Sequence, residues 1–167
     1  MITSEIQSRL IQYATSRNRA IGMSLGHGTD GGVWKSDQKT AIKVFHRKLN
    51  YETERDCYRL LMDKNVTEIC GFAIPRLVDY DNDLMVVEMD IVEPPYILDF
   101  GKAYLHREPL HFSRETMAEW YAEQKELWDE HWPTVQRILG RLRSLGIYQV
   151  DARPGNIRPA NWNPSLD

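Results

Sequence analysis

A glycine-rich segment followed directly by an apolar strand pattern constrains this chain most. Residues Gly26–Val33 read GHGTDGGV, which fits the spacing GxGxxGxV. Glycines let a backbone turn tightly and bring its N–H groups close to an anion such as phosphate. A Rossmann dinucleotide-binding unit needs a strand before this motif and a helix after it. Here a strand pattern follows at 39–46 (KTAIKVFH), which argues against that class. A plain glycine-rich hairpin is the alternative for the loop alone.

A single lysine interrupts the strand pattern after the glycine loop. Lys43 is the one charged residue in the run AIKVF, and a charge on a buried strand needs a partner. The following helix pattern offers Glu52 and Glu54. Glu54 is preferred, because it shares a helix face with the core-type residues Tyr58 and Leu61, and Glu52 is then a solvated charge. The pair would aim the ammonium at phosphate oxygens, while an edge strand with a snorkelling lysine remains the alternative.

A loop late in the chain combines an acid, a cation and an amide. Residues 147–157 read IYQVDARPGNI, with Asp151 and Asn156 five positions apart. An aspartate held in a loop can accept the proton of an attacking hydroxyl. The amide oxygen of Asn156 suits Mg²⁺, which prefers oxygen ligands, and Arg153 between them can neutralise a phosphate. A turn built from common turn-forming residues fits the same segment.

Hydrophobic periodicity predicts an α+β order of elements. Helices are expected at 4–17, 50–63, 113–131 and 133–145, and strands within 22–35 and at 39–46, 74–79, 84–89 and once within 147–167. Ser4, Asn50 and Ser113 are the predicted N-caps. Pro133 is expected to open the last helix and Gly146 to end it. Residues 97–112 match no clear pattern. The order predicts a small sheet lobe followed by a mostly helical lobe.

In their order and separations, these segments resemble the protein kinase superfamily. Its signatures are GxGxxGxV, the strand lysine of VAIK, a glutamate on the next helix, and HRDxxxxN. Here they read GHGTDGGV, TAIKVF, YETERDCYRLL and QVDARPGN. The last form, with Gln149 in place of the family's histidine, is more similar to the compact atypical, small-molecule and bacterial kinase-like branches. The resemblance implies one kinase-like domain over 1–167, with an N-lobe to about residue 90 and a minimal C-lobe over 91–167.

The resemblance also implies a role for each matching residue. Lys43, paired with Glu54, would contact the α- and β-phosphates of ATP. Asp151 would be the catalytic base, with Arg153 also among the catalytic residues, and Asn156 would bind Mg²⁺. Val87 would lie near the gatekeeper position, on the strand that enters the hinge. The cofactor-binding residues would be Gly26, Gly28, Gly31, Val33, Ala41 and, through their backbone groups at the adenine, Glu88 and Asp90.

The pattern departs from the family beyond Asn156. The family's metal-binding Asp-Phe-Gly (DFG) motif normally lies about a dozen residues further on, and none stands there. The motif is therefore expected to be missing, and the chain to stop after the catalytic loop. Asp167, eleven residues past Asn156, is the candidate metal ligand, with a terminal residue of no role as the alternative.

Three function classes follow from these matches and departures. The first is an ATP- and Mg²⁺-dependent phosphotransferase acting on a protein or small molecule. The second is a catalytically impaired pseudokinase that binds nucleotide or regulates a partner. The third is a small α+β interaction domain in which the kinase motifs are coincidental. The retained lysine, glutamate, aspartate and asparagine favour the first class, and the expected lack of DFG favours the second.

Composition narrows the partners and the location. The net charge of −3 implies no general attraction to nucleic acid. No window approaches 18 apolar residues and the first residues lack a signal-peptide pattern, so neither a membrane partner nor export is expected. Cys57 and Cys70 lack metal-site spacing, and buried free thiols in the cytoplasm are expected. The scattered histidines make no metal set, and the tryptophans between 120 and 132 are expected to pack in a core.

Overall fold

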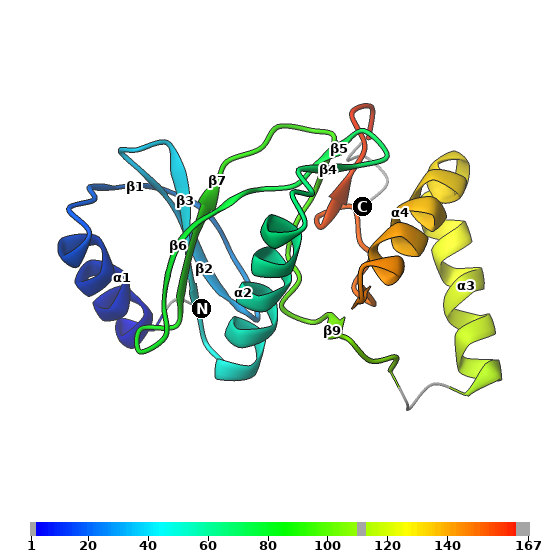
Figure 1. Cartoon of the computed structure of the whole chain (residues 1–167), viewed down its shortest axis with the longest axis horizontal. Helices are drawn as coiled ribbons and strands as arrows, with labels where there is room; N and C mark the ends of the chain where they lie inside the picture. Colours follow the sequence, from blue (N-terminus) through cyan, green and yellow to red (C-terminus); the bar gives the residue numbers. More distant parts are fainter. Residues whose placement is uncertain (1–2, 110–112, 163–167) are drawn as a thin grey trace.

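A computed structural model of the chain describes residues 3–109 and 113–162. Figure 1 shows α1, an antiparallel sheet and α2 side by side, with α4 and α3 beyond α2 at the far side of the molecule. The predicted α+β class, with a small sheet lobe first and a mostly helical part second, is confirmed.

The first lobe is built on one five-stranded antiparallel sheet. Its strand order is β1-β2-β3-β7-β6, so β7, which leads into the second half of the chain, lies beside β3. One helix covers each face of this sheet (Figure 1). The elements of this lobe are α1 (Ser4–Ser16), β1 (Ile21–His27), β2 (Gly31–Ser36), β3 (Thr40–Phe45), α2 (Lys48–Asp63), β6 (Leu77–Asp81) and β7 (Val86–Asp90).

Alternation along β3 explains why the lysine points into the site. Successive side chains of a strand face opposite sides of the sheet. Ile42 and Val44 join the apolar cluster under α1, whereas Ala41 and Phe45 join the main core on the α2 side. Lys43 shares the second face, and it is buried there. A shift of one residue in register would turn its ammonium toward α1 instead.

Two of the three predicted N-caps differ from the observed ones. Thr3 caps α1, where its hydroxyl accepts from the backbone N–H of Ile6, so Ser4 is already the first helical residue. Helix α2 begins two residues before Asn50, and its N-cap Arg47 makes no side-chain capping bond. Ser113 caps α3 (Arg114–Trp128) as predicted.

The second half of the chain adds two long-range strand pairs that the sequence patterns did not predict. The segment after β7 runs antiparallel to the late loop, pairing first at Ile97 with Ile157 and then at Leu105 with Ile147. The strands involved are β8 (Tyr96–Ile97), β9 (Tyr104–Leu105), β10 (Ile147–Tyr148) and β11 (Ile157–Arg158), and β8 also joins the hairpin of β4 (Glu68–Ile69) and β5 (Phe72–Ala73).

Two helices, joined by a short turn, pack against the late loop. Helix α3 leads through a 3₁₀ turn, η1 (Asp129–His131), into α4 (Trp132–Ser144), with Pro133 in its first turn as predicted. Trp128 and Trp132 are buried in the main core, which confirms core packing for these two aromatics. The Trp128 indole N–H donates to the Ala152 carbonyl at 3.2 Å and so ties the loop to the helices. Among the described residues no helix has the length and apolarity needed to cross a bilayer.

Candidate functional site

A cleft of about 710 Å³ lies where the glycine loop, the α2 face of the sheet and the second half of the chain meet. It has a roof, formed by the turn between β1 and β2, and a floor that includes the strand lysine. Among the predicted site residues, those that line it are Gly26, Gly28, Gly31, Val33, Ala41, Lys43, Glu54, Asp90 and Arg153. The structure therefore brings most of the predicted nucleotide-binding residues around one cavity.

Lys43 is held between two carboxylates at the floor of this cleft. Its Nζ lies 2.6 Å from Glu54 Oε2 and 3.0 Å from Asp99 Oδ1. Lys43 and Glu54 are both buried, whereas Asp99 is partly open to the cleft. The predicted preference for Glu54 over Glu52 thus agrees with the geometry, since Glu52 pairs with Lys48 on the outer side of α2. Two short ion pairs fix the ammonium in one position.

Burial and charge act in opposite directions on this group of three. Burial raises the pKa of Glu54 to about 7, although the Lys43 ammonium favours its ionised form. Burial also opposes the charge of Lys43, yet Glu54 and Asp99 outweigh it and keep the pKa of the ammonium above its ordinary value. Although burial opposes its charge too, Asp99 keeps a pKa below the ordinary value because Lys43 lies beside it. At neutral pH the lysine and Asp99 therefore carry opposite charges.

Asp99 is the site residue that the sequence reasoning missed. The tripeptide Asp99-Phe100-Gly101 is a DFG sequence, so the expectation that the motif is missing is wrong. It was overlooked because it precedes the Asp151–Asn156 loop, whereas the family carries it after that loop. The signal was present in the poorly patterned stretch at 97–112. Pairing of β8 with β11 puts the tripeptide beside the loop despite the reversed order in the chain.

The residues after Asp99 anchor it against α2. Phe100 is fully buried, and its ring meets the edge of Tyr58 at a centroid distance of 5.3 Å. A Cβ on Gly101 would lie 3.2 Å from Glu54 Oε2 and 3.4 Å from the Asn50 carbonyl oxygen. This close approach leaves little room for any side chain larger than hydrogen. The packing fixes the Asp99 backbone relative to the Lys43–Glu54 pair.

The late loop places Asp151 at the edge of the cleft. Arg153 grips its carboxylate with two contacts, Nε to Oδ1 at 2.6 Å and Nη2 to Oδ2 at 2.8 Å. The Asn156 side-chain amide donates to the Asp151 carbonyl at 2.8 Å, which closes the turn. Gln149, where the family has histidine, donates to the Asp99 carbonyl at 2.9 Å. These bonds join the loop to the DFG segment, although neither Asp151 nor Asn156 lines the cavity itself.

Steric crowding explains one glycine of the loop. A Cβ on Gly31 would collide with the carbonyl oxygen of Val44, because β2 and β3 approach each other closely where the loop ends. The backbone N–H of Gly28 donates to the Gly31 carbonyl at 2.9 Å and makes the tight turn. The loop is therefore a folded hairpin tip above the cleft rather than an open arm.

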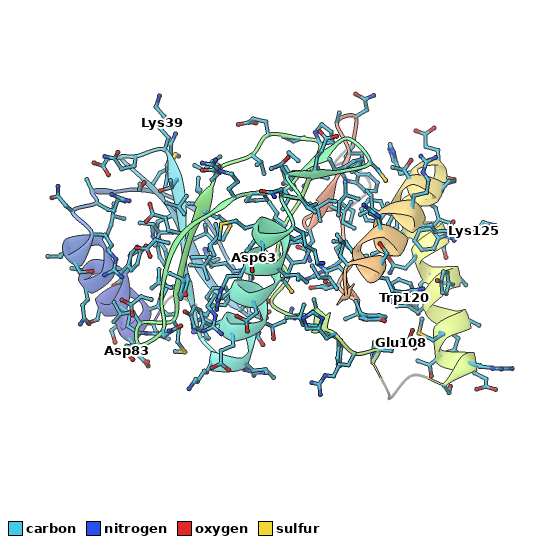
Figure 2. The ribbon with its side chains drawn as sticks, in the orientation of Figure 1. Lys39, Asp63, Asp83, Glu108, Trp120 and Lys125 are labelled. Atoms are coloured by element: carbon cyan, nitrogen blue, oxygen red, sulfur yellow. The ribbon has the colours of Figure 1, made fainter. Side chains whose placement is uncertain are left out.

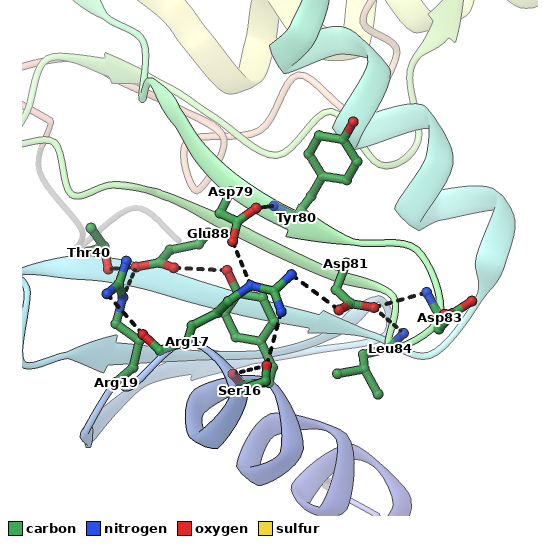
Figure 3. A network of polar contacts seen from close by, with 11 residues as sticks. Ser16, Arg17, Arg19, Thr40, Asp79, Tyr80, Asp81, Asp83, Leu84 and Glu88 are labelled. Carbon is green, nitrogen blue, oxygen red and sulfur yellow. Dashed lines mark hydrogen bonds and ion pairs between the residues drawn. The ribbon is translucent and has the colours of Figure 1, made fainter.

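At the adenine end of the predicted site, where backbone groups of Glu88 and Asp90 are expected, Asp90 lines the cleft and Glu88 does not. The side chain of Glu88 is fully buried on the α1 face of the sheet, where it accepts from Tyr13, Arg19 and Thr40 (Figure 3). Glu88 does not line the cleft, because it alternates with Val87 and Met89 along β7. The residues that line the cavity at this end run from Met89 through Asp90 to Val92.

Among the residues that the structure describes, the remaining predicted groups form no second site. Asp167 and His111 lie outside the described residues. Within residues 3–109 and 113–162 no three His, Cys, Asp or Glu side chains gather closely enough to hold a metal by themselves. Cys57 is buried, and burial raises the pKa of its thiol to about 12, whereas Cys70 is exposed, contrary to expectation.

Comparison with known proteins identifies similar solved structures but no family. No protein-family model matches the sequence, and no curated protein matches it. Among solved structures the chain is similar to APH(2'')-IIa in a ternary complex with streptomycin and ATP, with a TM-score of 0.41 at 20% identity. It is also similar to ADP-bound aminoglycoside phosphotransferase APH(2'')-Ib and to APH(2'')-IIa bound to gentamicin, each with a TM-score of 0.39 at 19% identity. These matches cover 77% of this chain and 40% of each of those chains.

Proposed function

We propose that this chain carries the nucleotide site of an ATP-dependent phosphotransferase of the protein-kinase-like kind. The observation that carries the proposal is Lys43, held between Glu54 and Asp99 on the floor of a cleft roofed by the glycine loop. A buried ammonium with fixed partners is a phosphate ligand that needs little rearrangement when an anion arrives. The chain spans 40% of the length of the solved structures it matches, so the activity of the whole protein is part of the proposal.

Asp99 in the cleft and Asn156 on the adjacent backbone, which does not itself line the cavity, offer oxygen donors of the kind that Mg²⁺ takes. Asp99 offers a carboxylate, of which Oδ1 contacts Lys43. The Asn156 amide nitrogen is used on the Asp151 carbonyl, which leaves the amide oxygen as the group for a cation. Two oxygen donors completed by phosphate and water are the usual environment of Mg²⁺ in nucleotide sites. When bound, the ion would neutralise and orient the phosphates. Asp99 takes the role that the sequence assigned to Asp167.

Different residues of the site would bind the nucleotide and take part in the transfer step. The backbone of Met89–Val92 would meet the adenine, and the inner phosphates would lie against Lys43 and the glycine loop. In the transfer step an acceptor hydroxyl oxygen bonds to the γ-phosphorus while the bond from that phosphorus to the β,γ-bridging oxygen breaks. ADP leaves with the electron pair of that bond, and Asp151 takes the hydroxyl proton.

One observation favours the pseudokinase alternative. The Asp151 carboxylate is engaged by Arg153 through both oxygens, so an acceptor hydroxyl would have to compete with the guanidinium for access to the lone pairs that remain. An arginine that stays in place would leave nucleotide binding intact and suppress transfer. The earlier reason for this alternative, an expected lack of DFG, no longer applies because Asp99-Phe100-Gly101 is present.

Thermal unfolding with ATP, with and without Mg²⁺, tests the proposal. At a concentration of 100 times Kd, binding stabilises the wild type by about 2.7 kcal/mol, which raises Tm by roughly 5 to 10 °C. Lys43→Met should lose most of this ligand-induced shift. Asp151→Asn should keep the shift and lose basal γ-phosphate release, and a wild type that shifts but never releases phosphate favours the pseudokinase. No shift under any condition contradicts both forms of the proposal.

A further inference from the structure

Lys102 contacts the glycine loop and the late loop at the same time. It follows directly after the Asp99-Phe100-Gly101 segment and lines the cleft. Its Nζ lies 3.5 Å from Asp30 Oδ2 and 3.4 Å from Thr29 Oγ1 at the tip of the glycine loop. The same nitrogen lies 3.6 Å from Asp151 Oδ2. Lys102 thus spans the cleft at the end where Asp151 stands.

The acidic partner in the glycine loop is held independently of Lys102. The Asn50 side-chain amide of α2 donates to Asp30 Oδ1 at 2.8 Å, and the His46 backbone N–H donates to the Asp30 carbonyl at 2.9 Å. The Asp30 side chain is only 13% exposed. A fixed carboxylate at the tip of a phosphate loop repels an incoming phosphate, so its charge needs a nearby cation. Lys102 supplies that cation.

The contacts of Lys102 are long compared with those of Lys43. An ammonium carries three donors, and charge-assisted hydrogen bonds are strongest near 2.7–2.9 Å. None of the three contacts named above is shorter than 3.4 Å, whereas Lys43 meets Glu54 at 2.6 Å. Lys102 is also 38% exposed at the side chain, so it has freedom to move. The hydrogen bonds of the Lys102 ammonium to these partners are therefore weak.

We propose that Lys102 binds the terminal phosphate of a nucleoside triphosphate and positions it between the glycine loop and Asp151. This inference rests on the proposed function and deepens it. Lys43 sits at the floor, where two of its three donors meet carboxylates and the third is left for the inner phosphates. Arg153 is folded back onto Asp151. Lys102 is the cation that lines the cleft beside the proposed base and has weak contacts to exchange for phosphate oxygens. Lys102 would contact the terminal phosphate directly and hold it in position. The new contact would replace its weak contacts with Asp30 and Asp151.

The test compares a triphosphate with a diphosphate. Affinities for ADP and for a non-hydrolysable ATP analogue, both with Mg²⁺, would be measured by calorimetry on the full chain. In Lys102→Met the affinity for the ATP analogue should fall roughly tenfold or more, as expected for a lost hydrogen bond to a charged group, while ADP changes by less than about twofold. Lys102→Arg should retain most of the preference for the triphosphate, because it keeps the positive charge.

Lys125→Met is the matched control, since Lys125 is an exposed lysine on α3 that points away from the cleft (Figure 2). It should bind both nucleotides as the wild type does. An equal loss for both nucleotides in Lys102→Met, or no loss, overturns the role of Lys102 while the proposed nucleotide site stands. A wild type that binds neither nucleotide overturns both.

Discussion

Lys43 shows how one residue connects burial, charge and function. The sequence places it on a buried strand and requires a partner, and Glu54 on the next helix supplies one. The structure adds Asp99 as a second partner, which compensates the ammonium even when Glu54 is protonated. Because burial raises the pKa of Glu54 to about 7, the protonation of this glutamate changes within the physiological range.

The raised pKa of Glu54 has a definite sign in folding stability. A carboxyl group whose pKa is higher in the folded state contributes stability that is full below its unfolded pKa and is lost as pH rises through the folded value. Relative to Glu54→Gln, the wild type should therefore lose stability between pH 4.5 and about 7. The slope should be on the order of 1 kcal/mol per pH unit at most. Urea unfolding of both proteins across this range measures it.

The opposite trend, with the wild type gaining stability over Glu54→Gln as the pH rises, would mean that the Lys43 charge outweighs burial. Asp99 does not confuse the measurement. Although burial opposes its charge, the Lys43 ammonium keeps the pKa of Asp99 below the ordinary value of an aspartate, so its contribution is lost only at pH values below this window.

At the scale of elements, long patterned segments were predicted well and short ones were not. The helices α1, α2, α3 and α4 have apolar periodicity over at least 13 residues each, and the structure has them near the predicted bounds. The strands β8 to β11 have two residues each. So short a run has no readable alternation, and these strands form only because distant partners meet them.

The sheet itself separates two networks, one on each face. On the α1 face, Glu88 accepts from Arg19 at 3.0 Å (Figure 3). It also accepts from Tyr13 at 2.8 Å, while Lys43 on the other face of the sheet lines the cleft. Burial and the Glu88 carboxylate also keep the pKa of Tyr13 above its ordinary value, so the phenol remains a donor. This network attaches α1 to the sheet and takes no part in the cleft.

Glu88→Gln should therefore destabilise the fold without weakening the nucleotide site. The substitution keeps the shape but removes the charge that compensates Arg19, at an expected cost of about 1–3 kcal/mol in the free energy of unfolding. Nucleotide affinity should stay within about twofold of the wild type, in calorimetric titrations well below the lowered Tm. A large loss of ADP affinity in a folded Glu88→Gln protein would show that the network on the α1 face also supports the nucleotide site.

At the scale of the whole molecule, the site depends on pairing between distant segments. Asp99 precedes Asp151 by more than 50 residues, and β8 meets β11 to bring them together. The backbone N–H of Leu98 donates to the Asn156 carbonyl at 2.8 Å, so the proposed metal donors lie on adjacent backbones. The Asp99-Phe100-Gly101 segment therefore lies beside the Asp151–Asn156 loop, although it precedes that loop by about 50 residues in the chain.

Asp99 and Asp167 can be compared directly by substitution. In Asp99→Asn, the gain in apparent ATP affinity that Mg²⁺ brings should fall at least about tenfold, because one metal donor loses its charge. ATP binding without Mg²⁺ should persist, since Lys43 keeps Glu54. Asp167→Asn should retain the Mg²⁺ effect. Loss of the effect in Asp167→Asn with full retention in Asp99→Asn would restore the assignment first made from the sequence.

The sequence alone determined the chemistry that Lys43, Glu54 and the glycine loop bring to the cleft. These residues lie on neighbouring elements, so local patterns and short-range packing suffice to place them. The position of Asp99 and the loss of Glu88 from the cleft were decided only by the tertiary structure. Strand register selects the face on which Glu88 lies, and a two-residue strand pairing across more than 50 residues of chain brings Asp99 to Lys43. Neither depends on a local pattern, because both are set by which distant backbones pair.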